Sequence, residues 1–123
     1  MSQPAPLSGL SVLVLEDDFY IAEDTRGVLE DAGASVLGPF AAAEPALLEA
    51  ERRQADCALV DINLGLGPDF APAERLLQLG VPIVLVTGYD HRIIPEPLSG
   101  VPCLQKPAQA RKIVAAIQTA CNR

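Results

Sequence analysis

Acidic residues follow two apolar stretches that are each about as long as a strand. Glu16, Asp17 and Asp18 come directly after the run VLVL, and Asp61 ends the later run CALVD. Like charges placed this close repel one another, and burying them without a partner would be costly. A bound cation would relieve the repulsion, and carboxylate oxygens with room for water favour Mg²⁺ or Mn²⁺. The acidic residues therefore predict a divalent metal site.

Two more strand-length runs are followed by residues that would complement such a site. Thr87 comes after PIVLV, and Lys106 comes two residues after VPCL. A lysine and a metal ion neutralise phosphoryl oxygens, and a hydroxyl donates a hydrogen bond to one of them. An aspartate can accept the phosphoryl group as an acyl phosphate. Each residue alone has an ordinary structural explanation, but together they predict a phosphoryl-transfer site.

The elements that must position these residues alternate between apolar strand-length runs and segments of helical period. Between 89 and 102, Pro95, Pro97 and Pro102 allow at most one helical turn, because proline inside a helix costs about 3 kcal/mol. We expect strands at 11–15, 35–37, 57–61, 82–86 and 101–104, and helices at 19–32, 42–53, 72–79 and 107–121.

This alternation predicts an α/β fold. We expect a flavodoxin-like, doubly wound sheet of five parallel strands in the order 2-1-3-4-5, with the fourth helix short or replaced by a loop. The ligand site of such a sheet lies beyond the carboxyl ends of the strands, where the order reverses. Here that point is between the first and third strands. The 123 residues suit a single domain, with a core at about 10–121 and a flexible segment at 1–9.

Composition excludes several classes of function. The net charge of −7 argues against direct nucleic-acid binding, which needs a basic face. No apolar run approaches the ~20 residues of a membrane span, and the start MSQPAPLSG lacks the features of a signal peptide. We therefore expect a cytoplasmic protein with no membrane partner. Cys57, Cys103 and Cys121 are too widely spaced for a zinc site or disulfide framework, and the first two read as buried, reduced thiols.

The segments VLVLEDD, ALVDINLG, VLVTGYD and LQKP together resemble the receiver domains of two-component response regulators. The resemblance runs from about Leu10 to the end of the chain. It implies that Asp61 is the phosphoacceptor and that Thr87 and Lys106 contact the phosphoryl group.

The same resemblance implies roles for the metal ligands and for two secondary positions. Glu16 and Asp17 would hold Mg²⁺ together with Asp61 and the backbone carbonyl of Asn63. Asn63 and Tyr89 match positions that tune dephosphorylation in the family.

Three features depart from the usual receiver pattern. Cys103 stands where most receivers carry the Phe or Tyr of an aromatic switch, so the usual ring movement cannot operate. Prolines break the fourth helix, and the loop NLGLGPDF after Asp61 is atypical. With the segment TGY, these features resemble an atypical, stand-alone subgroup common in alphaproteobacteria. One hypothesis is that Tyr89 transmits the signal by reorganising the proline-rich loop directly.

The resemblance implies a response regulator rather than an enzyme acting on external substrates. It would receive its phosphoryl group from a sensor histidine kinase or a phosphorelay. Because the chain ends with its last helix, we expect output through an unknown downstream protein or as a phosphate sink. One alternative is a pseudo-receiver, an interaction module that phosphorylation does not regulate. Another is a phosphatase of the haloacid dehalogenase type, although its nucleophile lies on the first strand, whereas Asp61 ends the third.

Overall fold

The computed structural model describes residues 5–64, 67–88 and 94–122. Its strands form one parallel sheet in the order β2-β1-β3-β4-β5. The predicted flavodoxin-like fold and strand order are therefore confirmed. The strands are β1 (Ser11–Leu15), β2 (Ser35–Phe40), β3 (Cys57–Asp61), β4 (Ile83–Thr87) and β5 (Cys103–Gln105).

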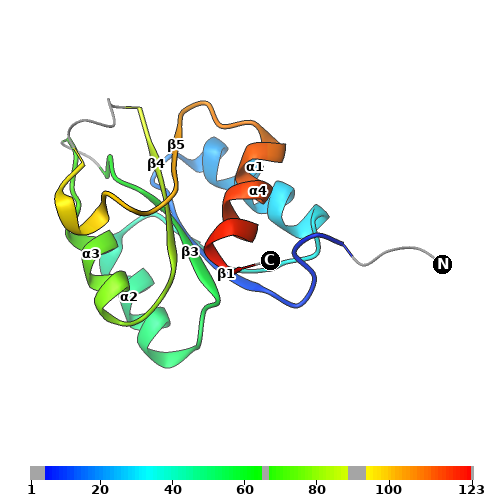
Figure 1. The fold of residues 1–123 in the computed structure, drawn as a ribbon, viewed down its shortest axis with the longest axis horizontal. Coiled ribbons are helices and arrows are strands. Elements are labelled where there is room, and N and C mark those ends of the chain that lie inside the picture. Colours follow the sequence, from blue (N-terminus) through cyan, green and yellow to red (C-terminus); the bar gives the residue numbers. More distant parts are fainter. Residues whose placement is uncertain (1–4, 65–66, 89–93, 123) are drawn as a thin grey trace.

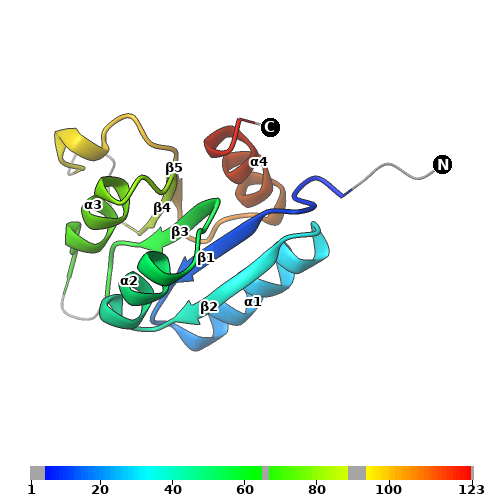
Figure 2. The ribbon, with the colours of Figure 1, turned by 90° about the horizontal axis from the view of Figure 1, so that it is seen from below.

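Helices cover both faces of the sheet. Figures 1 and 2 show α1 (Phe19–Asp31) and α4 (Ala110–Ala120) on one face, and α2 (Ala43–Arg52) and α3 (Ala71–Gln78) on the other. Three of the helices lie inside the ranges expected from the sequence, and α3 starts one residue earlier. The Asp18 side chain caps α1, as a short acidic residue before a helix does, by accepting hydrogen bonds from the next turn.

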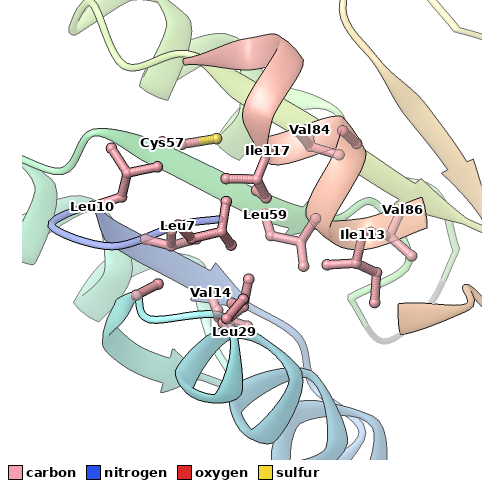
Figure 3. Close-up of a cluster of buried hydrophobic side chains, with 14 residues drawn as sticks. Leu7, Leu10, Val14, Leu29, Cys57, Leu59, Val84, Val86, Ile113 and Ile117 are labelled. Carbon is pink, nitrogen blue, oxygen red and sulfur yellow. The ribbon is translucent and has the colours of Figure 1, made fainter. Parts of the chain in front are cut away.

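The two layers of helices create two hydrophobic cores. Every residue of β3 and β4 is buried, which explains why these strands read as continuous apolar runs. Figure 3 shows the core beneath α1 and α4, where Leu29 and Ile117 pack against the sheet. The second core lies beneath α2 and α3 and includes Leu76 and Leu98.

The edge strand β2 departs from the prediction. The expectation that it ends at residue 37, before Gly38-Pro39, is wrong, because the strand continues to Phe40. Proline is tolerated on an edge strand, where its missing N–H removes no bond to a further strand. The extension matters for the site, since the backbone N–H of Glu16 donates to the Phe40 carbonyl at 2.9 Å.

The packed structure begins before the boundary near residue 10 that the sequence indicated. Leu7 is fully buried, and its N–H donates to the carbonyl of Ala32 at 2.8 Å. The segment 5–9 therefore contributes an apolar side chain to the core beneath α1 and α4.

The proline-rich segment lacks a fourth crossover helix in its described part. Residues 94–102 contain a single 3₁₀ turn, η2 (Glu96–Leu98), as the prolines predict. Leu98 is fully buried in the core beneath α2 and α3, so this irregular segment is anchored there. Residues 89–93 lie outside the described residues. No helix in the described part of the chain is long and apolar enough to cross a membrane.

Candidate functional site

Four predicted site residues lie at the carboxyl edge of the sheet. Glu16 directly follows β1, Asp61 ends β3, and Thr87 ends β4. Lys106 directly follows β5, and its backbone N–H donates to the Thr87 carbonyl at 2.8 Å. Parallel strands deliver their carboxyl ends to one edge, so these residues converge although they are far apart in sequence.

The side chain of Lys106 lies between two buried carboxylates. Its Nζ is 3.0 Å from Glu16 Oε1 and 3.0 Å from Asp61 Oδ2. Glu16 is 5% exposed and Asp61 is 2% exposed. Backbone donors hold the other carboxylate oxygens, from Asn63 to Asp61 Oδ1 at 2.9 Å and from Asp18 to Glu16 Oε2 at 3.1 Å. The acids are thus oriented by the backbone as well as by the lysine.

Burial changes the protonation of this cluster. Desolvation, with the hydrogen bond to Asp61, raises the pKa of Glu16 from 4.5 to about 7. Burial alone would lower the pKa of Lys106, but its hydrogen bonds to Glu16 and Asp61 outweigh that effect and raise it. Lys106 therefore stays charged at neutral pH, whereas Glu16 is close to its titration midpoint and can hold a proton when no metal is bound.

The acidic residues fit a hard divalent cation. One oxygen from each of Glu16, Asp17 and Asp61 lies within 4.8 Å of the others. Glu16 and Asp61 are buried, and Asp17 is exposed, so the cluster opens to solvent on one side. A set of carboxylate oxygens with access to water suits Mg²⁺ or Mn²⁺ better than softer metals. That the backbone carbonyl of Asn63 also binds the metal stays a prediction.

Of the three positions linked to signal transmission, the structure describes Thr87 and Cys103. Thr87 is fully buried at the end of β4. Cys103 is half-buried on β5, packs against the core beneath α2 and α3, and pairs in register with Leu85. A small thiol thus occupies the place of the usual aromatic ring, and burial raises its pKa. Tyr89 lies outside the described residues.

A cavity beside the carboxylates was not predicted from the sequence. It has a volume of about 370 Å³ and is lined by residues of α1, the sheet and the start of α4. Its charged lining residues are Glu16, Asp24, Asp61 and Lys106. Ile21, Thr25 and Val28 recur at helical spacing on its α1 wall, but this spacing does not distinguish a cavity wall from a packed face.

Solved receiver domains share this architecture over nearly the whole chain. The receiver domain of a modulated diguanylate cyclase from Desulfovibrio desulfuricans G20 is 31% identical, with a TM-score of 0.78, and the match covers 92% of this chain and 94% of that one. The chain belongs to the receiver domain family of response regulators. No family model matches it.

Two further receivers extend the comparison. The receiver domain of the Erythrobacter litoralis PhyR response regulator is 26% identical with a TM-score of 0.75, over 92% of this chain and 90% of that one. A CheY-like receiver from Methanospirillum hungatei JF-1 is 24% identical with a TM-score of 0.81, over 92% and 94%, and supports the fold alone.

A curated relative is longer than this receiver. The phyllosphere-induced regulator PhyR of Methylorubrum extorquens is 28% identical over 116 residues, a match that covers 89% of this chain and 42% of PhyR. The receiver thus spans less than half the length of this relative.

Proposed function

We propose that this receiver accepts a phosphoryl group on Asp61 from a sensor histidine kinase or a phosphotransfer protein, in a reaction that requires Mg²⁺. It then signals through phosphorylation-dependent binding to a downstream protein, or drains phosphoryl groups from a relay. The observation that best supports this proposal is the position of Lys106, 3.0 Å from Asp61 and 3.0 Å from Glu16, beside the exposed Asp17.

The chemistry follows from the groups at this edge. A carboxylate oxygen of Asp61 attacks phosphorus, a P–O bond forms, and the P–N bond to the donor histidine breaks. Lys106 neutralises charge on the phosphoryl oxygens, and the Thr87 hydroxyl donates a hydrogen bond to one of them. Mg²⁺, held by Glu16, Asp17 and Asp61 with the carbonyl of Asn63, would supply further positive charge when bound.

An aromatic ring at position 103 cannot transmit the signal, because this position is Cys103. We assign the response to the loop that follows Thr87, with Tyr89 as its aromatic residue. Phosphorylation should shift the NMR signals of residues 90–101, and Tyr89→Ala should reduce those shifts. Equal shifts in the wild type and the variant would contradict this assignment.

Intact mass after incubation with acetyl phosphate tests the phosphoacceptor. The wild type should gain one phosphoryl group when Mg²⁺ is present and none when the metal is chelated. Asp61→Asn should gain none, whereas Asp31→Asn, which changes an exposed aspartate at the end of α1, should behave as the wild type. Phosphorylation of Asp61→Asn at the wild-type level would rule out the assignment.

A second candidate is the pseudo-receiver, which the thiol at position 103 favours because the usual switch residue is missing. Such a module would bind its partner whether or not it is phosphorylated. A receiver that fails to bind Mg²⁺, and that is not phosphorylated by acetyl phosphate or by a histidine kinase, would fit this alternative.

A further inference from the structure

Two cysteines that are distant in sequence meet at the amino edge of the sheet, opposite the carboxylates. Cys57 begins β3, and Cys121 is the C-cap residue of α4. Cys57 belongs to the core beneath α1 and α4, and Cys121 packs against that core. In Figure 3 the Cys57 sulfur points toward the C-terminal helix, which carries Ile117. Burial first, and then the neighbouring Cys121 thiol, raise the pKa of Cys57.

A backbone contact fixes Cys121 in this position. Its Sγ donates to the carbonyl of Asp56 at 3.6 Å, and Asp56 directly precedes Cys57 in the chain. The Asp56 N–H is itself bonded to the carbonyl of Ser11 at 2.8 Å, so this end of β3 is held against β1. The thiol pair therefore belongs to the ordered sheet and helix rather than to a loose chain end.

The third cysteine lies apart from this pair. Cys103 packs against the core on the opposite face of the sheet, beneath α2 and α3. Cys121 is half-buried and Cys57 is fully buried. An oxidant in solution therefore reaches Cys121 before Cys57, and the product of that reaction forms beside the second thiol.

We propose that Cys57 and Cys121 form a reversible disulfide, with a hydroperoxide as the oxidant. Cys121 Sγ already lies 3.6 Å from the carbonyl of the residue before Cys57, so the two thiols are neighbours whose sulfurs can reach bonding distance. The bond would join the end of α4 to the start of β3. This inference goes beyond the proposed phosphotransfer and does not depend on it, since the thiols lie at the other edge of the sheet.

The reaction balances in two steps. The Cys121 thiolate attacks the peroxide, an S–O bond forms, the O–O bond breaks, and water leaves after protonation. The Cys57 sulfur then attacks the sulfenic sulfur, an S–S bond forms, the S–O bond breaks, and the released hydroxide takes the Cys57 proton as water. Two thiols lose two electrons, and hydrogen peroxide is reduced to two waters.

The environment assigns these two roles. Burial, with the neighbouring Cys121 thiol, raises the pKa of Cys57, so it is a poor first nucleophile toward peroxide. The more exposed Cys121 is the thiol that is oxidised first, and Cys57 resolves the sulfenic acid.

Thiol alkylation after oxidation tests the proposal. The full chain is treated with hydrogen peroxide, unfolded, alkylated with N-ethylmaleimide and digested for peptide mass analysis. The oxidised wild type should carry the label on Cys103 alone and yield a linked Cys57–Cys121 peptide. Its Tm should rise by several degrees, because the bond closes a long loop in the unfolded chain, and dithiothreitol should reverse the rise.

Matched variants make the result decisive. Cys103→Ser should still form the linked peptide, whereas Cys121→Ser, which changes a half-buried residue, should not. Asp61→Asn should oxidise as the wild type does, which separates this test from the phosphotransfer proposal. Labelling of all three cysteines after peroxide treatment, or sulfinic acid at Cys121 with no linked peptide, would overturn the proposal.

Discussion

Lys106 is the positive charge that two buried carboxylates share. Its Nζ lies 3.0 Å from both Glu16 and Asp61, and its side chain is 21% exposed. Removing one partner from such a group leaves the remaining charges buried and uncompensated, which costs more than the net value of the pair. The lysine therefore has a structural role in the metal-free protein in addition to its proposed role in phosphotransfer.

We expect Lys106→Gln to lower the free energy of unfolding by about 2–3 kcal/mol in the absence of metal. Mg²⁺ should restore part of this loss by replacing the missing positive charge. Urea unfolding with and without Mg²⁺ measures both effects. Lys112→Gln, which removes an exposed lysine of α4, is the control and should change little. Equal stability of the two variants in metal-free buffer would contradict the structural role.

The raised pKa of Glu16 predicts a pH dependence in metal-free buffer. Below pH 4.5, the pKa of Glu16 in the unfolded chain, the Glu16 carboxyl is protonated in both the folded and the unfolded state. Its contribution to the free energy of unfolding is then fully present. Between 4.5 and about 7 the folded state keeps a proton that the unfolded state releases. This contribution therefore falls as pH rises through that window. A metal ion needs the ionised form, so proton and metal compete for Glu16.

Mg²⁺ should accordingly bind more tightly at pH 8 than at pH 6, by roughly tenfold for a single group that titrates near 7. Isothermal titration at the two pH values measures the ratio of the dissociation constants. Glu16→Gln removes the titrating group and should flatten the dependence. An unchanged affinity of the wild type across this range would show that Glu16 does not control metal binding.

Among the elements, η2 shows how an irregular segment is held in place. The turn spans only Glu96–Leu98, yet Leu98 is fully buried in the core beneath α2 and α3. Removing a buried side chain of this size costs the lost burial together with the cavity left behind. The proline-rich segment thus depends on apolar contacts, with Leu98 the fully buried one, more than on hydrogen bonding of its own.

We expect Leu98→Ala to lower the free energy of unfolding by about 2–5 kcal/mol. Leu48→Ala, which shortens a leucine of α2 that is 53% exposed, is the matched control and should stay within about 0.5 kcal/mol of the wild type. Urea unfolding of both variants measures the difference. A small effect of Leu98→Ala would mean that the segment detaches from the core at little cost.

At the same scale, the sequence predicts every strand and helix, and the bounds of some of them to the residue. β1 and β3 were correct at both ends, because each apolar run is bounded by polar residues. The expected end of β2 at residue 37 is three residues too early, because Gly38-Pro39 is typical of a turn. A proline would end a strand that is paired on both sides, because it lacks an N–H donor. β2 lies at the sheet edge and is paired on one side, so it can continue through Pro39.

For the whole molecule, the strand order is what made the site predictable. Once β1 and β3 are neighbours, Glu16 and Asp61 must meet whatever the details of packing. The cavity between α1 and α4 and the pair of Cys57 with Cys121 were not predictable in the same way. Both depend on how far apart helices and side chains settle, which strand order and residue spacing do not determine.

The arrangement of the sheet predicts a gradient of hydrogen exchange across the molecule. Amides of β3 and β4 are buried on both faces and should exchange most slowly, through global unfolding. Amides of residues 94–101, whose described N–H bonds go to nearby residues of the same segment, should exchange much faster. Exchange followed by mass spectrometry or NMR measures this order. Equal protection of the two regions would contradict this order.

The two edge strands, β2 and β5, affect whether the sheet can pair with the sheet of another copy in concentrated solution. β2 carries Pro39, which offers no N–H to an incoming strand, and β5 is only three residues long. Exposed strand edges are templates for intermolecular pairing, and proline or short length makes them poor ones. The apolar strands in the centre are thus shielded from joining a neighbouring sheet, which protects the folded domain against aggregation.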